Sequence, residues 1–504
     1  MLSKSKPDEM QSYLTDASNF AGGYAACVVF PATVEEVAEV LASASGAGIA
    51  VTVAGAGTGL VGGRVPFGGI VLATDKLNRI REVVAEEQGG RATAEAGVVL
   101  ADFRHAVDAR GLLYPPDPTE WSCYLGGTVA TNASGARTFK YGATRRYIRR
   151  LQIALPTGDV LALARGEILA RADGRLRIPL RSGQSIEVQL PTYRMPQTRK
   201  HAAGYYIAPG MDAIDLFIGS EGTLGVVVEI ETSLLPKPAG VLSGVVFFRD
   251  EAKLLAFVRA ARGASLRTRA GNQRGEIDAR ALEFFDMEAL RFLREKYPLI
   301  PIDAQGAIFF EQETDSETEE QLMNAWLTLL EAHEAALDAS WFATEERDQA
   351  RLREFRHQLP VLVNEWLAHH GQRKVSTDMS VPDDAFAAML NFYQESLRAT
   401  QLQYVIFGHI GDNHVHVNIL PRDEQEAAKA RDLYRRFIGR AVKVAGTISA
   451  EHGVGKIKRE HLRTLYGDEH LRQMAALKRA FDPACILGRG NIFAEELLGV
   501  MSDR

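Results

Sequence analysis

Residues 51–63 read VTVAGAGTGLVGG, a short apolar run followed by a glycine-rich loop. Gly57 to Gly62 match the G-x-G-x-x-G pattern of dinucleotide-binding folds, in which the loop must open a helix. Residues 63–69 instead read GRVPFGG, and glycine and Pro66 oppose helix propagation. The stretch therefore predicts a strand and a loop whose backbone N–H groups converge on an anion such as a diphosphate. A tight turn between strands without a ligand remains the alternative from this stretch alone.

The composition is typical of a globular protein with more than one domain. The chain has 504 residues, of which 46% are hydrophobic and 24% charged. At about 100–200 residues per domain, this length implies two to four folding units. Its 58 Lys and Arg against 64 Asp and Glu give a net charge of -6. Because this balance offers no general positive excess for phosphate backbones, we expect no nucleic-acid partner.

The cysteines and the apolar runs bear on the compartment. Cys27, Cys123 and Cys485 are far apart and lack C-x-x-C spacing, which predicts no disulfide framework and favours a reducing, cytoplasmic environment. Residues 1–14 have no apolar core and no run approaches ~18 apolar residues, so we expect neither a signal peptide nor a transmembrane segment. A peripheral contact with the inner membrane stays open, because average composition does not report local patches.

The distribution of glycine divides the chain. Glycines concentrate at residues 46–69, 126–142, 209–225 and 408–455, whereas residues 250–400 are rich in Ala, Leu, Glu and Arg. Pro236 and Pro238 stand where the pattern changes, which indicates a domain boundary.

Helical and strand-like patterns alternate irregularly, which predicts an α+β architecture. Thr33 and Glu36 form a capping box that starts a helix. The remaining predicted segments are strands at 50–53, 70–73, 153–155 and 241–248 and helices at 253–262, 317–335 and 472–480.

Two further glycine clusters carry small polar side chains. Residues 125–135 read LGGTVATNASG, preceded by the PPDP of residues 115–118, and residues 217–227 read FIGSEGTLGVV. Hydroxyl and amide groups beside glycine can hydrogen-bond a phosphate or a ring edge that the backbone approaches closely. Together with the first loop, the clusters favour one large bound cofactor over an empty turn.

In this order, the three strings resemble the vanillyl-alcohol-oxidase type of FAD-binding fold. Within it, the chain is similar to the FAD-linked D-2-hydroxy-acid dehydrogenases, which include D-lactate and D-2-hydroxyglutarate dehydrogenases and the catalytic subunit of glycolate oxidase. The resemblance implies a two-part FAD-binding domain and a substrate domain with an antiparallel sheet covered by helices. It places the FAD domain at residues 1–235, the substrate domain at 236–420 and a C-terminal segment at 421–504 that returns to the FAD domain.

The resemblance also implies which residues bind FAD. The first loop would hold the diphosphate, the second cluster and Pro116 would line the flavin and ribityl chain, and the third would close over the cofactor. Some relatives attach the flavin through a histidine in the first loop, but residues 51–66 contain no histidine, so we expect noncovalent FAD. The implied residues are Gly55, Ala56, Gly57, Thr58, Gly59, Pro116, Gly126, Gly127, Thr131, Asn132, Ser134, Gly135, Glu221, Gly222 and Val226.

Residues 404–421 contain two strand-like runs around Gly-Asp-Asn, which predicts a hairpin. With Asp412 and Asn413 as a two-residue loop, His409 and His416 would lie opposite each other on one face. Neutral imidazoles at this spacing suit a divalent cation, although histidine pairs in hairpins are usually structural.

A second string, SAEHGVG at residues 449–455, places a carboxylate beside an imidazole. Two His and one Glu form a known catalytic zinc set, and the same donors suit iron or manganese. Since G-H-x-G-D and S-x-E-H-G-x-G are the family's metal and catalytic strings, the resemblance implies that His409, His416 and Glu451 bind the metal and that His452 is the base.

Three further side chains are candidate substrate contacts. His414 departs from the family pattern and falls on the ligand face of the predicted hairpin, as an extra ligand, a substrate contact or an exposed side chain. Arg356 and Lys374 are cations that could read a second carboxylate, with a solvated surface charge as the alternative for each.

These features predict an enzyme that oxidises a D-2-hydroxy acid, D-lactate or D-2-hydroxyglutarate first, to the 2-oxo acid. Hydride would pass to flavin N5 and electrons onward to a quinone, a cytochrome or an electron-transfer flavoprotein. The alternatives are a non-catalytic flavin-binding subunit of an oxidase complex and a flavin-free metallohydrolase.

Overall fold

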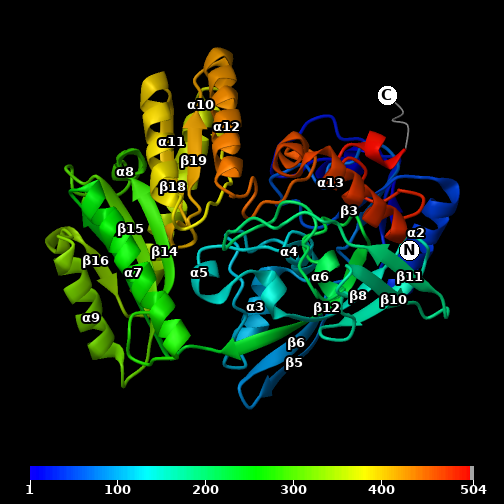
Figure 1. The fold of residues 1–504 in the computed structure, drawn as a ribbon, viewed down its shortest axis with the longest axis horizontal. Helices are drawn as coiled ribbons and strands as arrows, with labels where there is room; N and C mark the ends of the chain where they lie inside the picture. The colour runs from blue at the N-terminus through cyan, green and yellow to red at the C-terminus, as the bar shows by residue number, and fades with distance from the viewer. Residues whose placement is uncertain (500–504) are drawn as a thin grey trace.

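The computed structural model describes residues 1–499. The chain folds into two sheet-based parts with helices on both, and the C-terminal α13 lies beside the N-terminal elements (Figure 1). This arrangement confirms the predicted α+β class, with one part bearing the glycine clusters and a second part built on an antiparallel sheet.

The first sheet contains the glycine-rich loop. Its strand order is β1-β2-β4-β3, and β2, β4 and β3 run parallel. The strands and the flanking helices are β1 Leu2–Lys4, β2 Cys27–Phe30, β3 Val51–Ala54, β4 Ile70–Ala73, α1 Pro7–Met10 and α2 Val34–Ala47. The side chain of Thr33 accepts a hydrogen bond from the amide of Glu36, which confirms the predicted cap. Among the described residues no helix lies between β3 and β4, in agreement with rejection of the dinucleotide fingerprint.

The second sheet is antiparallel and adjoins the first. Its order is β5-β6-β12-β8-β9, with β7 paired to the end of β12. The elements of this layer are β5 Ile80–Glu86, β6 Gly89–Glu95, α3 Leu100–Asp108, β7 Leu112–Leu113, α4 Leu125–Ala130, α5 Thr138–Tyr141, β8 Ile148–Ala154, β9 Val160–Ala164, the hairpin β10 Arg175–Pro179 and β11 Ser185–Gln189, α6 Ile214–Phe217 and β12 Val226–Pro236.

The cap is the antiparallel sheet that follows β12. Its order is β16-β13-β15-β14-β18-β19-β17. Apolar side chains of α7, α9, α11 and α12 pack on one face, and those of α8 and α10 pack on the other. The elements are β13 Gly240–Phe248, α7 Glu251–Gly271, β14 Ala279–Asp286, α8 Met287–Arg294, β15 Gly306–Thr314, α9 Glu319–Ala332, β16 Trp341–Ala343, α10 Glu346–His369, β17 Val375–Ser376, α11 Phe386–Thr400, β18 Gln403–Gly408, β19 His416–Leu420 and α12 Glu424–Lys443.

The last part of the chain leaves the cap and joins the first sheet. It contains α13 (Arg459–Phe481), with a break at Gly467, and then an extended stretch that pairs with β3. The amide of Val51 donates to the carbonyl of Ile486 at 2.8 Å, and the amide of Gly488 donates to Val51 at 2.9 Å. The C-terminal segment thus extends the sheet that carries the glycine loop.

The histidine hairpin does not have the predicted register. His416 pairs with Phe407 rather than His409, and residues 409–415 form a longer loop with a 3-10 turn at Ile410–Asp412. The prediction of a two-residue turn at Asp412 and Asn413 was therefore wrong. Tertiary packing decides the loop, because a Cβ on Gly411 would lie 2.9 Å from the ring of Phe139, so this glycine lets the loop pack against the other domain.

Ion pairs join the cap to the part of the protein that carries the glycine clusters. Nε of Arg137, just before α5, lies 2.8 Å from Glu311 of β15. The neighbouring Lys140 lies 2.6 Å from Glu313. Because Arg137 and Glu311 are both almost fully buried, removing either partner would leave a buried charge unpaired.

Asp378, after β17, ties the C-terminal segment to the cap. Its carboxylate accepts hydrogen bonds from Nζ of Lys458 at 2.6 Å and from the hydroxyl of Ser449 at 2.6 Å. It also accepts from the backbone amides of Glu451 and His452 at 3.2 and 3.1 Å. Burial opposes ionisation of Asp378, but the ammonium of Lys458 holds the pKa of this carboxyl well below the usual range. This carboxylate therefore anchors the segment that carries two of the predicted site residues.

Gly126 and Gly127 offer a matched test of how α4 docks. A Cβ on Gly126 would lie 2.6 Å from the Cβ of Ala96, whereas none of the described neighbours of Gly127 would lie within 4 Å. We expect Gly126→Ala to lower the free energy of unfolding of the apoprotein by ~1–3 kcal/mol through overpacking. Gly127→Ala should leave it unchanged or raise it by up to ~1 kcal/mol, since alanine favours a helix. Denaturant unfolding measures the stability of both variants. Equal effects would contradict the close packing of Gly126 on Ala96.

The Asp378 anchor predicts a large loss of stability on charge removal. Asp378→Asn leaves the ammonium of Lys458 buried without its counter-charge, so the free energy of unfolding should fall by ~3–5 kcal/mol. The control is Asp432→Asn, which removes an exposed ion pair with Arg435 and should cost less than ~1 kcal/mol. Comparable small changes in both variants would show that Asp378 is not the anchor.

Candidate functional site

A cavity of about 320 Å³ lies where the three glycine clusters meet. Small side chains and exposed backbone of β3, α4 and the start of β12 form its walls, so a long cofactor can lie against main-chain N–H groups. This lining fits FAD, whose diphosphate needs such donors and whose rings need apolar walls. Of the predicted cofactor residues, those that line it are Gly55, Ala56, Gly57, Thr58, Gly59, Gly126, Gly127, Thr131, Ser134, Glu221, Gly222 and Val226.

The remaining predicted cofactor residues lie outside this lining. The carbonyl of Pro116 accepts a hydrogen bond from Arg104 at 3.2 Å. Oδ1 of Asn132 accepts from the backbone amide of Arg145 at 2.9 Å. The carbonyl of Gly135 accepts from Nζ of Lys200 at 2.8 Å. These three residues make hydrogen bonds within the protein, and their contact with FAD stays a prediction.

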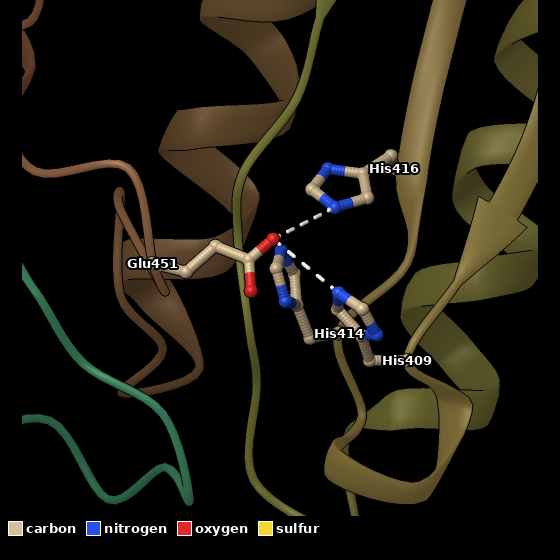
Figure 2. Close-up of side chains that lie close together, drawn as sticks. All are labelled: His409, His414, His416 and Glu451. Carbon is tan, nitrogen blue, oxygen red and sulfur yellow. Dashed lines mark hydrogen bonds and ion pairs between the residues drawn. The ribbon is translucent and has the colours of Figure 1, made fainter. Parts of the chain in front are cut away.

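The side chains of His409, His416 and Glu451 converge (Figure 2), and Glu451 also lines the cavity. Oε1 of Glu451 lies 3.3 Å from Nε2 of His409 and 3.2 Å from Nε2 of His416. The histidines come from the cap loop and β19, whereas Glu451 comes from the C-terminal segment. Two imidazole nitrogens and one carboxylate oxygen facing a common point fit the donor set of a divalent transition metal.

A buried outer shell orients these three side chains. Nδ1 of His409 lies 2.7 Å from Glu283, and Nδ1 of His416 lies 3.0 Å from the carbonyl of Thr377. Partners of this kind leave the Nε2 atoms directed at the shared point. Burial disfavours the charged form of Glu451, but Lys200, 3.2 Å away, and His409 hold its pKa well below the usual range. The carboxylate is therefore ionised, as a ligand must be.

His452 joins this cluster to the FAD cavity, which it lines. Its ring is nearly parallel to that of His416, with centroids 5.4 Å apart, and its Nδ1 lies 3.4 Å from Asp378. Burial lowers the pKa of His452 to about 4, against the opposing effect of Asp378. The imidazole is therefore neutral at pH 7 and able to accept a proton.

His414 lies within the same cluster. It is fully buried, and its ring centroid lies 4.5 Å from that of His416 and 5.3 Å from that of His409. Its Nε2 lies 3.2 Å from Asp378 without hydrogen-bond geometry. Within residues 1–499 neither ring nitrogen of His414 has a hydrogen-bond partner. A buried imidazole without a partner is costly unless something else binds it.

The two predicted cationic contacts have different surroundings. Arg356 of α10 lies 3.0 Å from Glu283, so it reaches His409 through that carboxylate. Lys374 is exposed just before β17. Near Arg356, a small cavity between the cap and the other domain is also lined by Arg353, His357 and Arg137.

The sequence patterns did not reveal the residues that surround the three candidate metal ligands. Lys200 and Glu283 come from segments without a recognisable motif, and no local signal marks them. Asp378 lies four residues after the candidate Lys374, but no sequence pattern singled it out. These residues are found by burial of charge, which depends on the tertiary structure.

No helix within residues 1–499 is both long and apolar enough to cross a membrane.

Comparison with known proteins agrees with this geometry. A family model described as "FAD binding domain" matches residues 25–164, and one described as "FAD linked oxidases, C-terminal domain" matches residues 243–492. Together they span most of the chain. The structure of an alkyldihydroxyacetonephosphate synthase has the same fold, with a TM-score of 0.65 and 15% identity over 96% of this chain and 82% of that chain.

Curated relatives match over nearly the full length. A Bacillus subtilis protein named glycolate oxidase subunit GlcD is 29% identical, covering 93% of this chain and 89% of its own. An Anaerostipes hadrus D-lactate dehydrogenase is 29% identical (91% and 87%), and a Stutzerimonas stutzeri D-2-hydroxyglutarate dehydrogenase is 26% identical (97% and 95%). With both of these domains, which together cover most of its length, the chain belongs to the FAD-linked oxidases and is an FAD-dependent oxidoreductase.

Proposed function

We propose that the protein oxidises a D-2-hydroxy acid, with D-lactate or D-2-hydroxyglutarate as the first candidates, using noncovalent FAD and a divalent metal. The observation that carries this proposal is the position of His452, which lines the FAD cavity and also stacks on the metal-ligand candidate His416. A single substrate carbon can then face both the flavin and the base. The names of the relatives support this substrate class.

The residues have distinct roles in this proposal. When bound, FAD would supply the hydride acceptor, and a zinc, iron or manganese ion would supply a positive charge that lowers the pKa of the substrate hydroxyl. His409, His416 and Glu451 would hold the metal. Asp378 faces Nδ1 of His452, so Nε2 is the nitrogen that takes the hydroxyl proton. Arg356 and Lys374 remain candidates for a second carboxylate, with Arg356 also positioning Glu283.

The wider assignments follow from the same proposal. Residues 1–235 would bind FAD, residues 236–420 would form the substrate domain, and residues 421–504 would complete the FAD site. The stretch at 486–488 that pairs with β3 supports this return of the chain. Reduced flavin would pass electrons to a quinone, a cytochrome or an electron-transfer flavoprotein. The cytoplasm, with peripheral contact at the inner membrane, is the compartment we propose.

His452→Gln tests the proposal directly. The variant should retain its FAD absorbance but lose at least ~100-fold in the rate of flavin bleaching by substrate, because the proton acceptor is removed. Anaerobic stopped-flow mixing with a panel of D- and L-2-hydroxy acids measures this rate. His105→Gln, on the exposed surface of α3, is the control. If the flavin of the variant bleaches at the wild-type rate, His452 is not the base. If no hydroxy acid bleaches the flavin of the wild type, the protein is a non-catalytic flavin-binding subunit.

His414 allows a test of the metal site. We expect His414 to add a further imidazole ligand, because its buried ring nitrogens lack protein partners within the described residues. His414→Asn should then weaken metal binding by ~10-fold or more, as ligand-sphere changes typically do. Chelator competition and elemental analysis of the FAD-loaded protein give this affinity. His461→Asn, on α13, serves as the control. Unchanged metal affinity with a raised KM would instead make His414 a substrate contact. Full activity of the metal-free wild type would refute the proposed role of a metal in the reaction.

A further inference from the structure

The ionisable side chains that line the FAD cavity are mostly negative. FAD carries a diphosphate with two negative charges, so the cavity needs compensating positive charge or N–H donors. Of the described lining residues, Arg64 is the only lysine or arginine. The carboxylic acids of the lining are Asp16, Glu120, Glu221 and Glu451, and its imidazole is that of His452.

Arg64 lies against the loop expected to hold the diphosphate. A Cβ added to Gly57 would overlap Nη1 of Arg64. Gly57 has a φ of 84°, a left-handed value that favours glycine. The guanidinium therefore occupies the space that a side chain at position 57 would fill. Arg64 follows Gly57 by seven positions, so the glycine and the cation that packs on it come from one short stretch of chain.

The guanidinium is held in place but is not neutralised by a direct ion pair. Nη2 donates to the carbonyl of Ser12 at 2.6 Å, and the group lies 5.2 Å from the ring centroid of Tyr13. Within residues 1–499 no carboxylate oxygen lies within 4.0 Å of a guanidinium nitrogen of Arg64. Its buried Nε also lacks a hydrogen-bond partner among the described residues. A partly buried arginine keeps its charge, so the cavity contains a cation with unused donors.

We propose that Arg64 is the side-chain counter-charge for the FAD diphosphate. Its planar donors suit phosphate oxygens, and its hydrogen bond to Ser12 keeps it beside the loop at Gly55 to Gly59. The main-chain amides of the loop and this single cation together bind the anion. The N-terminal segment thereby contributes to cofactor binding, because Ser12 and Tyr13 contact the guanidinium of Arg64 although neither of them lines the cavity.

The test compares two flavins that differ in the diphosphate. Apoprotein is titrated with FAD and with riboflavin, following flavin fluorescence, for the wild type and for Arg64→Met. A charged hydrogen bond contributes ~1.5–3 kcal/mol, so FAD affinity should fall ~10-fold to 100-fold. Riboflavin affinity should change less than about threefold, because riboflavin presents no phosphate to Arg64. Arg110→Met, at an exposed position two residues after the end of α3, controls for loss of a surface charge.

Salt dependence gives a readout that does not require the variant to be as stable as the wild type. Raising the ionic strength should weaken FAD binding by the wild type, and this dependence should be flatter in Arg64→Met. Arg64→Lys, which keeps the charge and loses the fork, should fall between the two. Unchanged FAD affinity in Arg64→Met would overturn the proposal, as would an equal loss for FAD and riboflavin. So would FAD binding by the wild type that is insensitive to salt.

Discussion

The candidate site depends on a buried carboxylate, that of Asp378, which holds the C-terminal segment against the cap. It accepts hydrogen bonds from Lys458, Ser449 and the amides of Glu451 and His452. These bonds are strong because the group is almost completely shielded from water. Without them, Glu451 and His452 would not meet histidines that come from a different domain.

A second carboxylate binds the same C-terminal segment to the part of the protein that carries the glycine clusters. Glu221, in the third glycine cluster, accepts hydrogen bonds from the amides of Val454 and Gly455, each at 2.7 Å. The same short segment is thus held by Asp378 of the cap and by Glu221 of the FAD-binding part. This double attachment places His452, the proposed base, between the cap and the cavity that it lines.

Local patterns predicted the elements that depend on local interactions. The Thr33 cap, β4 and the absence of a helix after the glycine loop followed from capping and backbone preferences. The register of the histidine hairpin did not, because Gly411 packs on Phe139 across the domain boundary. Arg356 likewise carried no sequence signal that its charge would be paired with Glu283, a residue 73 positions away.

The glycine clusters are a local property of the chain, and their side-chain-free backbone provides the main-chain donors that the cavity needs. The sequence also determined the donor types, two histidines and a glutamate, of the candidate metal site. Which of these groups meet depends on how the chain folds. Burial brought Lys200, Glu283 and Asp378 around the ligands and set Arg64 beside Gly57, because the cost of an unpaired charge depends on surroundings that no single stretch of chain contains.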